Sequence, residues 1–190
     1  MSSLVGHATA GFTVFLCCHH ARGASKRVAV MYVLLAICAD VDYLAVWGLG
    51  YSAHPRVTHS ILFALVASLL ARTALRSRDS TTVPIAGLLI AGLSHPILDL
   101  LVGAHGIPML WPWRTEVSLA IGVLPSAGTL DPTNYFLWRN LLIELGILLP
   151  FFALLIALAR RAAFRTTWKR GVLIAPLWLA FVAWSMMLPR

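Results

Sequence analysis

The sequence predicts an all-α membrane protein with about six transmembrane helices and an intramembrane metal site opening to the extracytoplasmic side. Of the 190 residues, 59% are hydrophobic and only 12% are charged, whereas a soluble domain carries about 25% charged residues. The mean hydropathy of +0.83 points the same way. Histidines and aspartates nevertheless interrupt the apolar segments. This third observation predicts a polar centre enclosed by the transmembrane helices.

Six apolar segments define the expected spans. A transmembrane helix needs roughly 20 apolar residues, so the first and third segments should extend into flanking polar residues. No cleavable signal peptide is expected, because Met1–Gly6 carries no positive charge. The expected spans are Leu4–Cys18, Val28–Leu49, Ser60–Leu75, Val83–Val102, Asn140–Ala159 and Val172–Leu188.

We expect one transmembrane domain over residues 1–190. Its first part, 1–115, carries the candidate metal ligands, and 139–190 supplies two further helices. The segment 103–138 between these parts is long for a membrane loop, so it is expected to form a loop or a re-entrant lid.

The net charge of +8 is explained by topology. Most basic residues fall in three loops on one face, which the positive-inside rule places in the cytoplasm, with both termini outside. Because these charges flank spans instead of gathering on one folded face, no nucleic-acid partner is expected. Eleven of the 15 basic residues lie in those loops: Arg22, Lys26, Arg27, Arg72, Arg76, Arg78, Arg160, Arg161, Arg165, Lys169 and Arg170.

Six side chains with metal-ligand chemistry lie in or beside the expected spans, all toward the extracytoplasmic side. A charged residue at the centre of a membrane costs roughly 2.5–3.5 kcal/mol on the insertion scale. A shared metal ion is the simplest partner for all of them. The six candidate metal ligands are His7, Asp40, Asp42, His59, His95 and Asp99.

The spacing of these residues favours chelation. His95 and Asp99 are four residues apart, so they share a helix face and can bind one ion. Asp40 and Asp42 are two apart and would point to nearly opposite sides of a regular helix. Either the helix unwinds there, or only one aspartate binds metal while the other orients a histidine or a second ion. Imidazole and carboxylate together suit one or two zinc ions, with manganese as an alternative.

The order of these motifs resembles the LexA-binding, inner-membrane-associated metal-dependent hydrolases. The resemblance covers about residues 1–115 and implies a multi-pass protein of the prokaryotic inner (cytoplasmic) membrane, with its active site facing the extracytoplasmic side. That family usually has His-Arg-Gly where this chain has His54-Pro55-Arg56. The motifs are His7, Ala39-Asp40-Val41-Asp42, Thr58-His59-Ser60, Ser94-His95-Pro96-Ile97-Leu98-Asp99 and Gly106-Ile107-Pro108-Met109-Leu110-Trp111-Pro112.

The spacing His95-x3-Asp99-x5-His105 is also similar to zinc-dependent phospholipase C and its related nucleases. In that group the aspartate at the Asp99 position bridges two zinc ions, and the resemblance makes His105 a further candidate ligand. The group's last ligand pair is missing here, because no histidine follows His105. Two metals are therefore favoured over three.

These observations lead us to expect a metal-dependent hydrolase of an ester or phosphoester bond in a membrane lipid or lipid-linked envelope substrate, with amide cleavage as the nearest alternative. Asp40, or Asp42 if it is not a ligand, would accept a proton from the attacking water. His54 would protonate the leaving group, and Arg56 would bind a phosphate or carboxylate.

Two other classes stay open on the sequence alone. A metal-ion or proton-coupled membrane transporter could use the same aspartates and histidines, although they cluster on one side and no second half repeats them. A structural membrane protein with a polar core and no activity is the other alternative. Glu144, in the fifth span, either supports the metal site or makes a packing hydrogen bond.

Overall fold

A computed structural model describes residues 2–19, 25–43, 49–50, 55–76, 83–103, 105–120, 122–126, 133–160 and 164–188. Within these residues the regular structure is helical, apart from one isolated antiparallel bridge between Ile107 and Val117. The predicted all-α class is therefore confirmed. The elements are α1 (Leu4–Cys18), α2 (Lys26–Ile37), η1 (Cys38–Val41), η2 (Val57–His59), α4 (Ile61–Arg76), α5 (Ile85–Val102), α6 (Tyr135–Arg160) and α7 (Phe164–Met186), where η marks a short 3-10 helix.

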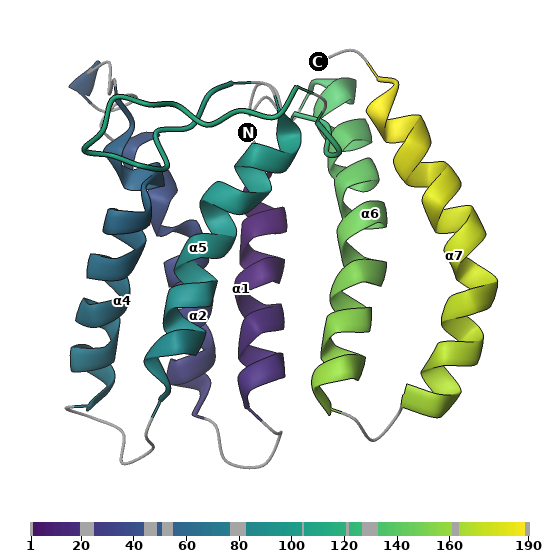
Figure 1. Cartoon of the computed structure of the whole chain (residues 1–190), viewed down its shortest axis with the longest axis horizontal. Helices are drawn as coiled ribbons and strands as arrows, with labels where there is room; N and C mark the ends of the chain where they lie inside the picture. The colour runs from purple at the N-terminus through teal and green to yellow at the C-terminus, as the bar shows by residue number, and fades with distance from the viewer. Residues whose placement is uncertain are drawn as a thin grey trace.

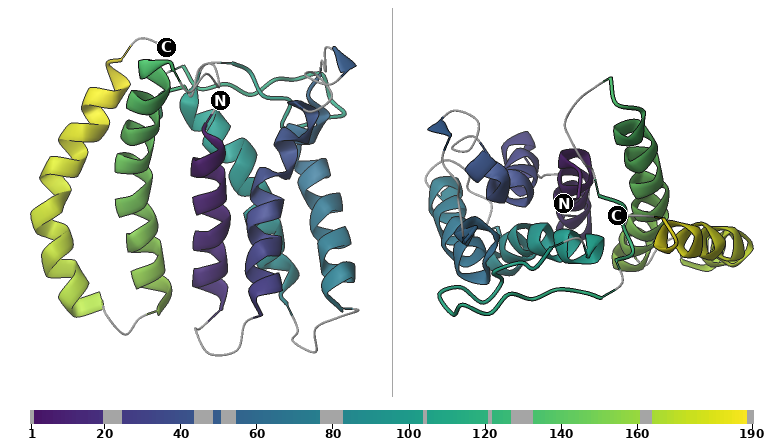
Figure 2. Two further views of the ribbon diagram at one scale, coloured as in Figure 1. Left: turned by 180° about the vertical axis from the view of Figure 1, so that it is seen from behind. Right: turned by 90° about the horizontal axis from the view of Figure 1, so that it is seen from above.

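The α-helices stand side by side, and α1 begins at the same end of the array where α7 finishes (Figure 1). α5 packs against α1, α2 and α4, while α6 packs against α1 and α7. Figure 2 shows the same order from behind and from above, with α7 at the outer edge of the array. Both α5 and α2 therefore contact every other α-helix of the N-terminal half.

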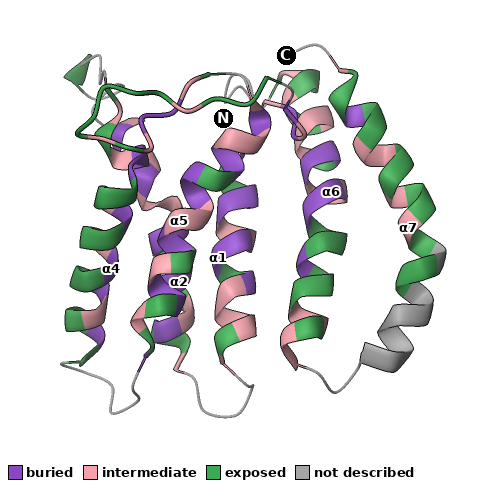
Figure 3. Ribbon diagram, in the orientation of Figure 1, coloured by how far each residue is buried: buried purple, intermediate pink, exposed green. Residues whose placement is uncertain are grey.

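Two apolar clusters hold the helices together. One joins α1, α5 and α6 through residues such as Ala10, Leu98 and Ile147. The other joins α2, α4 and α5 through residues such as Tyr32, Ala71 and Leu88. Figure 3 shows the buried faces of α1, α2 and α5 turned toward one another, whereas α7 is largely exposed. The polar residues described below lie at one end of this packed region.

Hydrogen bonds at the helix ends fix where α1 and α4 begin. The Ser3 hydroxyl accepts the Gly6 N–H at 2.9 Å, and the Ser60 hydroxyl accepts the Phe63 N–H at 3.1 Å. These two caps place His7 one turn into α1 and His59 directly before α4. α5 ends at Gly103, whose φ of 66° is a left-handed conformation that glycine adopts readily.

The segment after α5 runs across the end of the array where α1 begins (Figure 1). It is tied to α5 by bonds from the backbone N–H groups of Val123 and Leu124 to the Leu101 carbonyl, at 2.6 and 3.0 Å. The Ile61 N–H, at the start of α4, donates to the Met109 carbonyl at 3.0 Å. The described part of the predicted loop 103–138 therefore lies over the helix ends.

Two of the described helices, α5 and α6, are long and apolar enough to cross a membrane by length and composition. α1, α2 and α4 have 15, 12 and 16 residues, fewer than the roughly 20 that a span needs. Six spans are therefore not confirmed, and the multi-pass topology stays a prediction. Exposed leucines such as Leu70 and Leu142 nevertheless give α4 and α6 apolar outer faces.

Candidate metal centre

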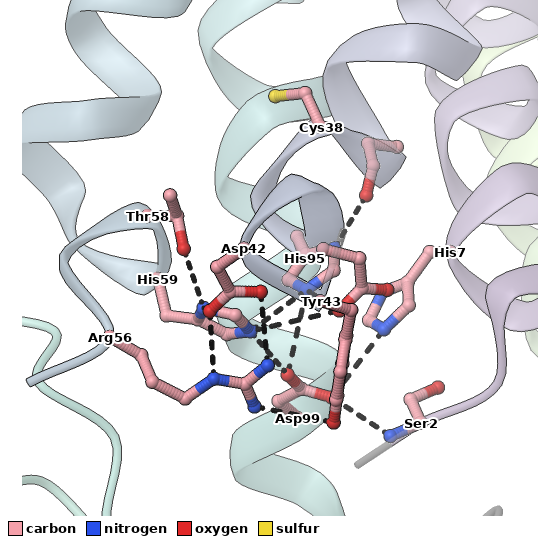
Figure 4. A network of polar contacts seen from close by, with 12 residues as sticks. Ser2, His7, Cys38, Asp42, Tyr43, Arg56, Thr58, His59, His95 and Asp99 are labelled. Atoms are coloured by element: carbon pink, nitrogen blue, oxygen red, sulfur yellow. Dashed lines mark hydrogen bonds and ion pairs between the residues drawn. The ribbon is translucent and has the colours of Figure 1, made fainter. Parts of the chain in front are cut away.

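Five of the six predicted ligands come together near the end of the array where α1 begins. α1 supplies His7, η1 supplies Asp40, η2 supplies His59, and α5 supplies His95 and Asp99. All but Asp40 are buried. In Figure 4 the side chains of His7, His59, His95 and Asp99 point toward one another. Segments separated by up to 92 positions in the sequence therefore meet at one polar centre, which the sequence analysis predicted.

The second expected span differs from the observed helix, and the segment where they differ carries Asp40. The span was predicted over Val28–Leu49, but α2 ends at Ile37 and continues as the 3-10 helix η1. Such unwinding was one of the two alternatives for the Asp40 and Asp42 spacing. The regular α-helix does end before Asp40, and the two aspartates take different partners. That only one of them binds metal stays a prediction.

The end of α2 also orients His95. The last carbonyl groups of an α-helix have no partner within the helix, and the Ala36 carbonyl lies 2.7 Å from His95 Nδ1. A carbonyl oxygen only accepts hydrogen bonds, so Nδ1 carries the proton and the lone pair of His95 is on Nε2. This arrangement directs His95 Nε2 into the centre as an available ligand atom.

Three ligand atoms form a triangle whose sides match the geometry of a metal site. His59 Nε2 lies 3.3 Å from His95 Nε2 and 3.3 Å from Asp99 Oδ2, and His95 Nε2 lies 3.5 Å from the same oxygen. With metal–ligand bonds of about 2.0–2.2 Å, neighbouring ligands of a tetrahedral ion are separated by about 3.3–3.6 Å. The three atoms can therefore be ligands of one divalent cation without rearrangement of the backbone.

Asp40 and His7 extend the centre in two directions. Asp40 Oδ1 lies 3.6 Å from His95 Nε2 and 3.9 Å from His59 Nε2. His7 stacks on His95 with ring centroids 3.7 Å apart, and its Nε2 lies 3.4 Å from Asp99 Oδ1. Two groups within the described chain thus have ligand atoms within 4.8 Å of one another: His7, His95 and Asp99, and Asp40, His59 and His95.

Several polar atoms in this centre lack a hydrogen-bond partner among the described residues. They are both ring nitrogens of His7, Asp40 Oδ1 and Asp99 Oδ2. Burying such a group unpaired costs about 1–3 kcal/mol, and more when it is charged. A cation bound to the two carboxylate oxygens and one nitrogen of His7 would remove much of that cost, so the donor set fits a divalent metal.

Asp42 lies outside both groups and pairs with Arg56 instead. The guanidinium donates from Nε to Oδ2 at 2.8 Å and from Nη2 to Oδ1 at 3.0 Å. It also lies over the Tyr43 ring, 4.3 Å from the centroid. Burial disfavours the charged form of Arg56, but the hydrogen bonds and charge of Asp42 outweigh it, so the pKa of Arg56 is raised and the guanidinium stays positive.

Asp42 and Arg56 border the metal centre through His59. Asp42 Oδ2 lies 3.8 Å from His59 Nδ1, and the Thr58 hydroxyl lies 3.1 Å from the same nitrogen. These contacts leave His59 Nε2 facing His95 and Asp99 (Figure 4). Asp42 therefore lies beside a candidate ligand, and its own predicted ligand role stays a prediction.

Of the two other predicted residues, His54 and His105, the structure describes only His105. His54, predicted as the general acid, lies outside the described residues. His105 is exposed in the segment after α5 and belongs to neither of the two groups found in the described chain.

Sequence reasoning missed part of the environment of Asp99. The Ser2 N–H donates to Asp99 Oδ1 at 2.8 Å, and the Ser3 N–H donates to both carboxylate oxygens of Glu144. The sequence makes Glu144 a candidate, whereas Ser2 and Ser3 carry no motif that indicates a role. The acid in an apolar span was the available signal, since a buried acid needs hydrogen-bond donors.

The described residues thus define an all-helical protein with apolar outer faces and a buried histidine–aspartate centre at one end. A family model described as YdjM inner membrane protein matches residues 1–188, so the chain belongs to the YdjM inner membrane protein family. No curated protein and no solved structure matches the chain. The expected membrane association and inner-membrane location are thereby confirmed.

Proposed function

We propose that this protein is a membrane-embedded, metal-dependent hydrolase of an ester or phosphoester bond in a lipid or lipid-linked envelope substrate. The observation that carries the proposal is the triangle of His59 Nε2, His95 Nε2 and Asp99 Oδ2, with sides of 3.3–3.5 Å. Imidazole and carboxylate ligands at these separations suit zinc, with manganese as the alternative.

His59, His95 and Asp99 would hold the first ion, with Asp40 adjacent. Asp99 presents Oδ2 to this set and Oδ1 to His7, so one carboxylate could serve two ion positions. A bound divalent ion lowers the pKa of water toward ~7 and polarises a carbonyl or phosphoryl oxygen. This chemistry, together with the resemblance of the motifs to membrane hydrolases and phospholipase C, supports hydrolysis.

Asp40 has the side chain best placed for proton transfer. It is 16% exposed, whereas the side chains of His59 and Asp99 are each 3% exposed. Its Oδ1 has no hydrogen-bond partner among the described residues. Asp40 would therefore accept a proton from a water molecule that approaches the ligand triangle. His54 keeps its proposed role as the acid for the leaving group.

Arg56 supports an anionic substrate group. Its side chain is 22% exposed, and its guanidinium stays charged beside Asp42. A phosphate or carboxylate reaching this edge of the centre could be attracted by the positive charge of Arg56. The apolar faces of α4 and α6 favour a substrate that is itself dissolved in the membrane, and the outer-leaflet orientation follows from the predicted distribution of basic loops.

Metal content and lipid turnover test the proposal together. Detergent-purified wild type should retain about one or two zinc or manganese ions per chain by mass spectrometry, and His95→Ala and Asp99→Ala should lose them. Ser68→Ala is the matched control, because Ser68 is buried but donates only to the Ala64 carbonyl of its own helix.

The purified proteins are then incubated with labelled phospholipids and lipid-linked envelope precursors. Cleavage by wild type and the control, but not by Asp99→Ala, supports the hydrolase. If both His95→Ala and Asp99→Ala retained the metal, the proposed metal site would be refuted. Metal flux that follows a gradient across proteoliposomes, without lipid cleavage, would favour the transporter instead.

A further inference from the structure

Glu144 is a buried acid beside an apolar cluster. It lies in α6 and is 1% exposed, with Ile143 and Ile147 of the same helix in the apolar cluster against α1 and α5. An acid in such a place is costly unless hydrogen-bond donors satisfy its oxygens. The partners of Glu144 therefore indicate what holds it there.

Those partners all belong to the start of α1. The Ser3 N–H donates to Oε1 at 3.0 Å and to Oε2 at 3.1 Å, and the Ser2 hydroxyl donates to Oε1. A side chain at Gly6 would collide with Glu144 Oε1, so the glycine allows this close approach. A carboxylate at this end also interacts favourably with the partial positive charge of the helix N-terminus.

The same two residues connect Glu144 to the metal centre. The Ser2 N–H donates to Asp99 Oδ1 at 2.8 Å (Figure 4). This bond fixes one carboxylate oxygen and leaves Oδ2 facing His59 and His95, at 3.3 and 3.5 Å. One turn further along α1, the His7 N–H donates to the Ser3 carbonyl at 3.0 Å. The segment that Glu144 binds therefore contacts Asp99 directly and forms the helical turn that carries His7.

We propose that Glu144 is a positioning residue for the metal site: by binding the backbone and side chains of residues 2–3, it orients Asp99 and His7 for a divalent cation. The inference rests on the proposed function, since it assumes that Asp99 is a ligand. Outer partners of metal ligands typically change metal affinity by 10–100-fold when removed. α6 thus takes part in a site whose ligands all come from the preceding helices.

Two variants separate positioning from packing. Glu144→Gln keeps the shape and one carbonyl acceptor for the Ser3 N–H, while Glu144→Ala removes both acceptors. Zinc affinity, measured by competition with a chelating dye, should fall about 10–100-fold in Glu144→Ala. Glu144→Gln should recover most of that loss. Ser68→Ala is again the control, because it alters a buried polar residue without touching residues 2–3.

A second readout reports the geometry of the site directly. Cobalt(II) replaces zinc, and its visible absorption bands depend on the ligand arrangement. Glu144→Ala should change these bands at saturating cobalt, whereas Ser68→Ala should reproduce the wild-type spectrum. A defect that only lowers stability would not alter the spectrum of the folded, metal-loaded fraction.

The outcomes distinguish the two proposals. If His95→Ala and Asp99→Ala lose zinc, but both Glu144 variants keep wild-type affinity and the wild-type cobalt spectrum, the role of Glu144 is refuted and the metal site stands. If Asp99→Ala keeps wild-type zinc affinity, the metal site itself fails. Should Glu144→Ala prove too unstable to purify, Glu144→Leu takes its place, because it fills the buried space but accepts no hydrogen bond from residues 2–3. Unchanged zinc affinity and an unchanged cobalt spectrum in Glu144→Leu would refute positioning.

Discussion

His59 and His95 present their Nε2 atoms to each other at 3.3 Å, with ring centroids 4.9 Å apart and planes inclined at 78°. The Ala36 carbonyl accepts a hydrogen bond from His95 Nδ1, and the Thr58 hydroxyl lies within hydrogen-bond distance of His59 Nδ1. Each ring thus has one nitrogen engaged by the surrounding protein and the other directed at its neighbour. This arrangement leaves both Nε2 atoms available to the proposed ion.

Zinc should stabilise the folded protein through this pair. At a free zinc concentration of about 100 times Kd, binding adds ~2.7 kcal/mol to the free energy of unfolding, which corresponds to a rise in Tm of about 5–10 °C. His59→Ala removes one ligand and should abolish most of the rise. Thermal unfolding of detergent-purified protein with and without zinc measures both values; an equal rise in His59→Ala would contradict the ligand role.

Asp40 and Asp42 should differ in their effect on metal binding. Asp40→Asn weakens a ligand candidate that lies 3.6 Å from His95 Nε2, so zinc affinity should fall at least tenfold. Asp42→Asn changes a residue that is paired with Arg56 and lies 3.8 Å from His59 Nδ1, so its zinc affinity should fall less than that of Asp40→Asn. Chelator competition on the two variants compares them directly. The reverse order would assign the ligand role to Asp42.

The Asp42–Arg56 pair should contribute to stability as a unit. Arg56→Ala leaves the Asp42 carboxylate, 7% exposed in its side chain, without its bidentate partner. Because the guanidinium is partly exposed, the expected loss in the free energy of unfolding is about 1–2 kcal/mol. The double variant Asp42→Ala with Arg56→Ala should lose less than the sum of the single variants. Strict additivity in a denaturation series would show that the pair is uncoupled.

Gly103 should resist substitution. Its φ is 66°, and an added Cβ would lie 2.8 Å from backbone atoms of Gly122. Gly103→Ala should therefore cost about 1–3 kcal/mol in the free energy of unfolding. Gly171→Ala provides the matched control, because it meets no heavy atom within 4 Å and should be neutral or stabilising by up to ~1 kcal/mol in a helix. Equal stability of the two variants would contradict the strain at Gly103.

Apolar windows predicted the helices well where polar residues coincide with the helix ends. α1 has the predicted bounds, and α4 and α5 begin close to the predicted starts at Ser60 and Val83. α6 and α7 begin at Tyr135 and Phe164, earlier than predicted. Arg139, Arg165 and neighbouring basic residues ended the apolar windows there, although they have good helix propensity.

The site could be predicted only as far as residue chemistry and helical spacing allow. The four-residue spacing indicated that His95 and Asp99 share a helix face, and in the structure His95 Nε2 lies 3.5 Å from Asp99 Oδ2. The Ala36 carbonyl and the Asp42–Arg56 pair arise from backbone unwinding and a long-range approach, which hydrophobic periodicity does not encode. The bond from Ser2 to Asp99 joins positions 97 apart, and no local pattern distinguishes that serine from any other.

The distribution of the site along the chain has a consequence for assembly during synthesis. Every residue of the two metal groups precedes the end of α5 at Val102, so a nascent chain carries all these ligand atoms before α6 has been made. Glu144, which binds Ser2 and Ser3, is synthesised only as part of α6. The cation could therefore be captured early, while the final alignment of the N-terminal segment waits for the later pair of helices.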